Sequence, residues 1–144
     1  MRTFYMFKIN EDYSQLTKNL PYNLYSTYLN IKLSNKSNME YIYEQYKSIT
    51  APIDAEALSE ALFRKMQEFD GYTAFHKTHM YNNYYSDEVS KLTFYRSFIV
   101  LKSNKPNSTF FSILHSLPNI FVIDFENKDY FWLASLSNLR LVNA

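Results

Sequence analysis

Cysteine is absent from the sequence, and this absence excludes several kinds of protein. Without cysteine among its 144 residues, the chain has no disulfide framework, no thiol nucleophile and no thiolate ligand for a metal. Glycine is almost as scarce, because Gly71 is the single glycine, so no glycine-rich loop can hold a phosphate group. The sequence therefore excludes thiol chemistry, thiolate metal sites and a glycine-rich phosphate loop.

Long apolar runs and clusters of one charge are also lacking. The sequence contains no apolar run of about 18 residues, the length that spans a membrane, and no charged segment leads into an apolar run at its start. We therefore expect a cytoplasmic protein with no membrane partner. Fifteen basic and fourteen acidic side chains give a net charge of +1, and the lysines are dispersed. This balance argues against direct binding to nucleic acid.

Aromatic residues, by contrast, are abundant. The chain has 14 tyrosines and 12 phenylalanines, which is more aromatic surface than a small core needs. Tyrosine is enriched at protein interfaces because its ring packs while its hydroxyl stays in water. Two explanations remain open: an aromatic face that binds another protein, or a bias toward Asn, Lys, Tyr, Ile and Phe that reflects an A+T-rich genome.

Hydrophobic periodicity and capping residues predict five helices and a set of strands. The strands are predicted at 3–9, 89–102 (two strands or one bent strand), 120–123 and 130–133, and the helices at 11–18, 21–34, 38–50, 55–69 and 108–117. Residues 72–85 lack a clear apolar face and fit either an edge strand or an ordered loop. The prediction is an α/β fold, a single domain over residues 1–144 with a mixed β-sheet packed by α-helices, in which 134–144 form a loosely ordered tail.

Individual residues carry further expectations. Asn10, Asp54 and Ser108 are predicted to cap the helices that follow them, and Ser37 with Glu40 has the spacing of a capping box. We expect Gly71 to adopt a left-handed conformation after the fourth helix. Residues 86–88 are predicted to form a turn.

The candidates for chemistry favour structural roles. His76 and His79 are three residues apart, but no metal-binding frame surrounds them, so we interpret them as a solvated loop pair. His115 is interpreted as a helix-surface residue, since no glycine elbow or local carboxylate accompanies it. Asp124, at the end of an apolar strand, should need a backbone N–H or a basic partner. We therefore predict no catalytic residue, no metal, no cofactor and no small-molecule substrate.

Several segments resemble the bacterial family of sporulation inhibitor of replication proteins, SirA, over essentially the whole chain. The similar segments are Met1-Arg-Thr-Phe-Tyr-Met-Phe-Lys-Ile-Asn-Glu-Asp-Tyr13, Tyr46-Lys-Ser-Ile-Thr-Ala-Pro-Ile53, Thr109-Phe-Phe, Asp124-Phe and Tyr130-Phe-Trp-Leu133. The resemblance implies a small α/β protein without enzymatic activity. It also implies a partner, the N-terminal domain of the replication initiator DnaA, whose action at the chromosome origin the protein would block.

By the same resemblance, the partner-binding residues are Tyr13, Thr17, Gln45 and Ser48, on the first short helix and on the helix that ends at Thr50. Tyr13 and Gln45 keep the family's residue types, whereas Thr17 and Ser48 stand where relatives carry aromatic residues. Two alternatives remain: a member of this fold that binds a different protein, or a small enzyme, for which the sequence offers no convergent polar constellation.

Overall fold

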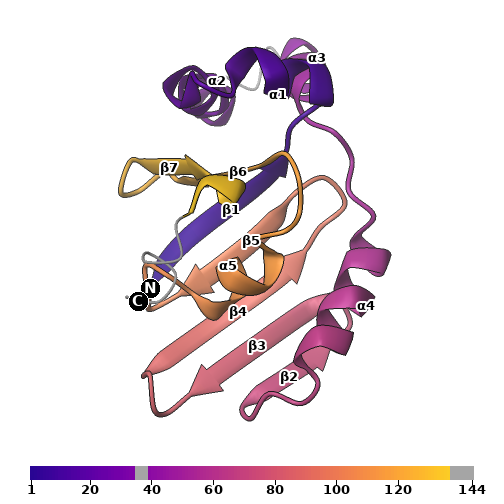
Figure 1. The fold of residues 1–144 in the computed structure, drawn as a ribbon. Helices are drawn as coiled ribbons and strands as arrows, with labels where there is room; N and C mark the ends of the chain where they lie inside the picture. Colours follow the sequence, from indigo (N-terminus) through magenta and orange to yellow (C-terminus); the bar gives the residue numbers. More distant parts are fainter. Residues whose placement is uncertain (35–38, 137–144) are drawn as a thin grey trace.

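One seven-stranded antiparallel sheet organises the molecule. The computed structural model describes residues 1–34 and 39–136, and Figure 1 shows the strands side by side in the order β2-β3-β4-β5-β1-β6-β7. Every pairing in the sheet is antiparallel. The strands are β1 (Arg2–Lys8), β2 (Tyr72–Phe75), β3 (Thr78–Asn83), β4 (Glu88–Phe94), β5 (Ile99–Ser103), β6 (Ile120–Asp124) and β7 (Asp129–Trp132).

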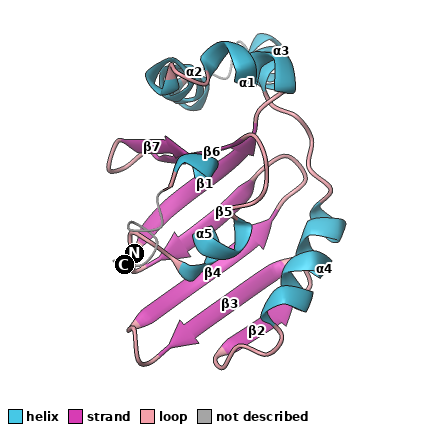
Figure 2. Ribbon diagram, in the orientation of Figure 1, coloured by secondary structure: helices cyan, strands magenta, loops and turns pink. Residues whose placement is uncertain are grey.

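Helices lie against both faces of this sheet, which confirms the α/β prediction (Figure 2). They are α1 (Glu11–Thr17), α2 (Pro21–Leu33), α3 (Met39–Ile49), α4 (Ala55–Met66), α5 (Thr109–Leu114) and the short 3-10 helix η2 (Leu133–Ser135). The predicted helices therefore all occur, and 89–102 forms two strands. Residues 72–85 form the hairpin β2–β3 instead of one strand or a loop. None of the described helices is long and apolar enough to cross a bilayer.

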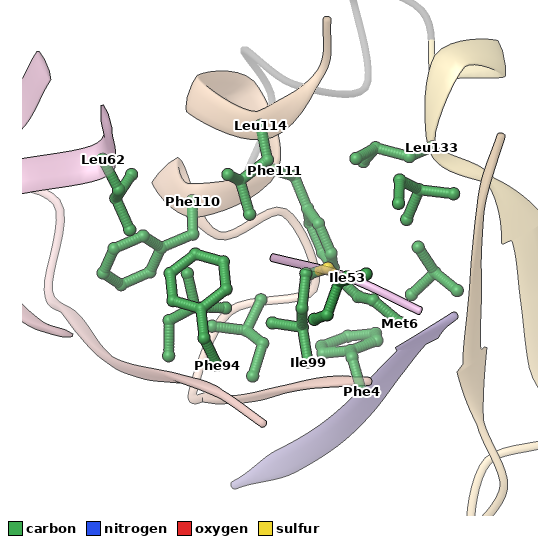
Figure 3. Close-up of a cluster of buried hydrophobic side chains, with 14 of the residues drawn as sticks. Phe4, Met6, Ile53, Leu62, Phe94, Ile99, Phe110, Phe111, Leu114 and Leu133 are labelled. Atoms are coloured by element: carbon green, nitrogen blue, oxygen red, sulfur yellow. The ribbon is translucent and has the colours of Figure 1, made fainter. Parts of the chain in front are cut away.

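The first face of the sheet carries an aliphatic and phenylalanine core under α4 and α5. Figure 3 shows Phe110, Phe111 and Leu114 of α5 pointing at the sheet, where they meet residues of β1, β4 and β5 such as Phe4. Phe4 and Phe111 pack edge to face with ring centroids 5.0 Å apart. Both side chains are fully buried, so this face supplies much of the apolar burial that stabilises the fold.

The second face is covered by α1, α2 and α3, a group called here the helical layer. The layer lies over β1, β6 and β7 at one end of the sheet, whereas β2 to β4 extend away from it (Figure 1). Phe7 of β1 stacks on Tyr28 of α2 with centroids 4.1 Å apart. β6 is buried at every position, as expected for a strand covered on both sides.

Capping explains where α4 and α5 begin. The Asp54 carboxylate accepts a hydrogen bond from the Ala57 N–H at 3.1 Å, and the Ser108 hydroxyl accepts one from the Phe110 N–H at 3.2 Å, so both predicted caps are confirmed. Glu88 was expected in a turn but is buried at the start of β4. Its carboxylate accepts bonds from the Ser108 hydroxyl and the Thr109 N–H, which hold α5 against the sheet. The predicted capping residue Ser37 lies outside the described residues.

Gly71 has the left-handed backbone that its sequence position predicted, with φ of +86°. A Cβ at this position would stand 2.0 Å from the Asn82 carbonyl oxygen. Gly71 therefore permits close approach of the backbone at the start of β2, in addition to a turn after α4.

Asp124 has the basic and backbone partners that were predicted for it. Its carboxylate accepts bonds from Arg2 Nε at 2.8 Å and from the Asn127 side chain at 2.7 Å and backbone at 3.2 Å. Arg2 also pairs with Asp129 at 3.0 Å, so one arginine joins the start of β1 to both strands of the β6–β7 hairpin.

The predicted tail is partly ordered. Residues 133–135 form η2, and Leu136 is buried in the core of the first face. Residues 137–144 lie outside the described part of the chain.

Candidate protein-binding site

Asn10 connects the start of α1 to the end of α3. It does not cap α1, as the sequence had suggested, because no side-chain capping bond forms there. Its side-chain amide instead donates to the Ser48 carbonyl at 2.7 Å and the Lys47 carbonyl at 3.4 Å. Its backbone N–H donates to the Ile49 carbonyl at 2.9 Å. The amide thus satisfies carbonyls that the last turn of α3 leaves without helical partners.

A backbone bridge next to Asn10 strengthens this junction. Ile9 pairs with Thr50 as an isolated antiparallel bridge, and the Ala51 N–H donates to the Lys8 carbonyl at 2.7 Å. The two helices that the sequence selected as partner-binding elements are therefore fixed to one another. The exposed sides of α1 and α3 beside this junction are called here the α1–α3 surface.

Tyrosine hydroxyls hold the helical layer onto the sheet. The Tyr28 hydroxyl and the Thr50 hydroxyl share a hydrogen bond of 2.6 Å, and the Tyr46 hydroxyl donates to the Ser97 carbonyl at 3.0 Å. Burial raises the pKa of Tyr28 and of Tyr46. Both hydroxyls therefore remain protonated at neutral pH, and they anchor α2 and α3 as neutral groups.

The four predicted contact residues differ in their accessibility. Tyr13 and Gln45 are half-buried, with part of each side chain on the α1–α3 surface, and Ser48 is exposed. Ser48 donates its hydroxyl to the Gln45 carbonyl at 2.7 Å. Thr17 is buried, and its hydroxyl donates to the Tyr13 carbonyl at 2.7 Å. Thr17 thus lies behind the surface that it was expected to form, because the inner side of α1 carries Ser14 and Thr17.

Two exposed apolar residues were missed as candidate contacts. Leu16 follows Tyr13 by one helical turn and is 74% exposed, and Tyr41 precedes Gln45 by one turn and is 70% exposed. The three-residue spacing of Tyr13 and Leu16 suggests one shared helical face, but the structure buries Ser14 and Thr17 of α1 instead. No sequence signal identified Leu16 as exposed, because a seven-residue helix is too short for its periodicity to select a buried side.

Helical spacing along α3 places Tyr41, Gln45 and Ser48 on one face and Tyr46 and Ile49 on another, and the structure keeps the two faces apart. Ile49 is buried and Tyr46 packs against the core of the second face, whereas Tyr41 and Ser48 on the other side are exposed. α3 therefore needs Tyr46 and Ile49 for folding and leaves Tyr41, Gln45 and Ser48 available for contact.

His79 occupies a position that the sequence did not indicate. It is buried between α4 and the β2–β3 hairpin, with Nε2 at 2.7 Å from the Ser59 hydroxyl and Nδ1 at 2.6 Å from the Tyr72 hydroxyl. Burial lowers the pKa of His79 to about 4, so the ring is neutral at physiological pH. The interpretation as a solvated pair is wrong for His79 and holds only for His76, which is exposed.

Ser59 beside His79 does not form an assembled nucleophile. The Ser59 hydroxyl also donates to the His76 carbonyl at 3.2 Å, and the residue lies within a turn of α4 and not on a strained loop. His115 is half-buried, with Nε2 3.1 Å from the Leu136 carbonyl oxygen. Among the described residues, no three His, Asp or Glu side chains group as metal ligands would.

No curated protein matches this chain. The family model described as sporulation inhibitor of replication protein SirA matches residues 2–137, which is nearly the entire sequence. The chain belongs to the SirA family.

Proposed function

We propose that this protein is a non-catalytic inhibitor of chromosomal replication initiation that binds the N-terminal domain of the initiator DnaA. The α1–α3 surface would be the contact region, and it would inhibit by occupying a surface that the initiator needs at the origin. Membership of the SirA family supports the replication role. The partner is the one that the family resemblance implies.

The observation that carries the proposal is the junction made by Asn10. It fixes α1 to the end of α3 and so places the two helices in one rigid surface. A preorganised surface binds without the cost of ordering its elements. Leu16 and Tyr41 add exposed apolar area beside the polar group of Gln45, and such a combination of aromatic, aliphatic and amide groups is typical of an interface core and rim.

The experiment is calorimetric titration of the purified N-terminal domain of the host's initiator with the protein and its variants. Leu16→Glu should weaken binding at least tenfold, because a charge would be buried at the interface. Tyr13→Ala should cost more than about 1 kcal/mol of binding free energy. Leu16 is exposed, so its replacement should leave the melting temperature unchanged.

Tyr84→Ala is the matched control, since Tyr84 is 97% exposed in the β3–β4 turn, far from the helical layer. This variant should bind as the wild type does. Wild-type binding that survives Leu16→Glu, Tyr13→Ala and Gln45→Ala together would place the interface elsewhere. Absence of wild-type binding would favour the alternative of a family member with a different protein partner.

A further inference from the structure

Within residues 1–34 and 39–136, no helix packs on the part of the second face formed by β2 to β4. The helical layer packs on β1, β6 and β7, and the register of the sheet shows which residues face the same way on β2 to β5. Two cross-strand rows of residues point to the second face. The first row is Thr73, Met80, Lys91, Lys102 and Thr3, and the second row is Phe75, Thr78, Thr93, Val100 and Tyr5. The part of these rows on β2 to β5 is called here the bare face.

The bare face carries apolar side chains among its threonines and lysines. Antiparallel sheets with one face in water usually show polar residues on it. Here Phe75 is 75% exposed and Met80 is 39% exposed, and Val100 stands between them and the helical layer. Exposed apolar residues gathered on one face mark an interaction surface more often than scattered ones do.

Two lysines face each other across the middle of the bare face. Lys91 of β4 is the direct cross-strand partner of Lys102 of β5, and both side chains are exposed. Like charges directly opposite one another in a sheet are destabilising. The carboxylates of Asp124 and Asp129 do not offset this repulsion, because they bind Arg2 on the first face of the sheet. An anionic group placed between Lys91 and Lys102 would relieve this repulsion.

An aromatic hollow adjoins the bare face where the helical layer ends. Its volume is about 260 Å³, and its wall includes the rings of Tyr5, Phe7, Tyr28, Tyr46, Phe98 and Phe125. Tyr5 and Val100 are cross-strand neighbours, so the hollow is continuous with the bare face. Lys32 stands at its rim with Nζ 4.6 Å from the centre of the Phe125 ring.

The size and chemistry of the hollow indicate its occupant. Small-molecule sites have volumes of roughly 300–1,000 Å³ and carry several convergent polar groups, whereas this hollow is smaller and almost wholly apolar. It therefore suits one aromatic or branched aliphatic side chain. Lys32 at its rim, with Lys91 and Lys102 on the adjoining bare face, favours anionic groups on either side of that side chain.

We propose that the bare face and its hollow form a second docking surface, separate from the α1–α3 surface, for an acidic segment of a protein that inserts one apolar side chain. Carboxylates on either side of that side chain would lie against Lys32, Lys91 and Lys102. A nucleic acid is less well matched, because its bases stack on flat, exposed rings and these rings line a concave wall. The proposal does not rest on the partner proposed for the α1–α3 surface.

The test is selection of binders from a displayed library of random 12-residue peptides on the immobilised wild-type protein. The enriched peptides should carry an aromatic or leucine residue flanked by Asp or Glu. The most enriched peptide, made synthetically, is then titrated into wild-type and variant proteins. Lys91→Glu with Lys102→Glu should weaken its binding at least tenfold, and Val100→Arg, which blocks the approach to the hollow, should abolish it.

Two controls make the result specific. Lys65→Glu changes the same charge on α4, which packs on the opposite face, and it should leave peptide binding unchanged. Leu16→Glu should also leave it unchanged, so that failure of this proposal is distinguishable from failure of the α1–α3 surface. No enriched peptide, enrichment without acidic residues, loss of binding in either control, or tighter binding of a 12-nucleotide poly-dT than of the peptide would each overturn the proposal.

Discussion

The two faces of the sheet are packed by different residue types and differ in how completely helices cover them. The first face is packed by phenylalanine and aliphatic side chains that are fully buried under α4 and α5. The second face is packed by tyrosines as well as by aliphatic and phenylalanine side chains, and the hydroxyls of Tyr28 and Tyr46 bond to side-chain and backbone groups at its edges. Its cover is only partial. We infer that the first face provides most of the stability, and that the second accepts less efficient burial because its surface is used for contact.

Truncation of a buried ring should separate the two faces most clearly. Phe111→Ala removes a fully buried ring from the first face and should cost about 3–5 kcal/mol of unfolding free energy. Phe98→Ala removes a half-buried ring from the wall of the hollow and should cost less than about 2 kcal/mol, since part of its area is already in water. Chemical denaturation of both variants measures the difference, and equal losses would contradict the comparison.

Asp124→Ala should give the next largest effect. Burial alone would raise the pKa of Asp124, but bonds from Asn127 and Arg2 outweigh it, so the pKa lies below its ordinary value of 3.8. A carboxyl group whose pKa is lower in the folded protein than in the unfolded chain stabilises the fold at pH values above its unfolded-state pKa. This stabilisation is lost as the pH falls through the folded-state pKa. At pH 7 the substitution should cost about 2–3 kcal/mol.

The pH dependence provides the check on Asp124. The difference in unfolding free energy between wild type and Asp124→Ala should shrink as the pH is lowered from 5 to below the ordinary pKa of 3.8. Asp129→Ala is the control, because Asp129 is half-buried and should have a smaller effect. A difference that stays constant over this range would show that the carboxylate charge is not what stabilises the hairpin.

Aromatic residues introduced at positions 17 and 48, which the family resemblance gives as aromatic, should differ from one another in their effect on stability. Thr17→Tyr places a large ring on the buried side of α1 and should cost about 1–3 kcal/mol of stability. Ser48→Tyr adds a ring to exposed surface and should leave the melting temperature within a few degrees while holding or strengthening binding to the initiator domain. Thermal melts and calorimetry of the two variants decide this, and equal destabilisation would mean that Ser48 is also enclosed.

Asn10→Ala should produce the smallest change in stability. It removes two side-chain bonds to the end of α3, one of them long, and should cost about 1 kcal/mol. Hydrogen exchange of the last turn of α3 should nevertheless accelerate, and binding to the initiator domain should weaken. Asn19→Ala, at an exposed position after α1, is the control. Unchanged exchange in α3 would show that the backbone bridge alone holds the two helices together.

The sequence was sufficient to predict the elements whose signals are local. Ser108 and Asp54 cap helices through bonds within three residues, and the apolar run 120–123 is buried as its composition indicated. Asn10 was misassigned because its partners, Lys47 and Ser48, are distant in sequence. His79 was misassigned for the same reason, since Ser59 and Tyr72 reach it only through the packing of α4 on the hairpin.

The sequence predicts which side of α3 is exposed at the candidate site, but it does not predict which side of α1 is buried. The two faces of α3 follow from helical periodicity, so Gln45 and Ser48 were placed on the outer side without knowledge of the fold. α1 is too short for its periodicity to select a buried side. Which of Thr17 and Leu16 faces inward depends on how α1 lies against Asn119, whose side chain accepts a bond from Ser14 at 2.9 Å. That contact joins residues far apart in the chain.

The central place of β1 has a consequence for the synthesis of the protein. β1 precedes the other strands of the sheet in the chain, yet its two neighbours are β5 and β6, and the bond from Arg2 to Asp124 spans 122 positions. β1 therefore remains unpaired until β5 has been translated, and its second edge remains open until β6 has been translated. Chains terminated before β5 should expose this aromatic strand and be open to proteolysis and aggregation, although β2 to β4 can still pair as successive hairpins. The helical layer packs on β1, β6 and β7, so the α1–α3 surface should form only after β7 has been translated.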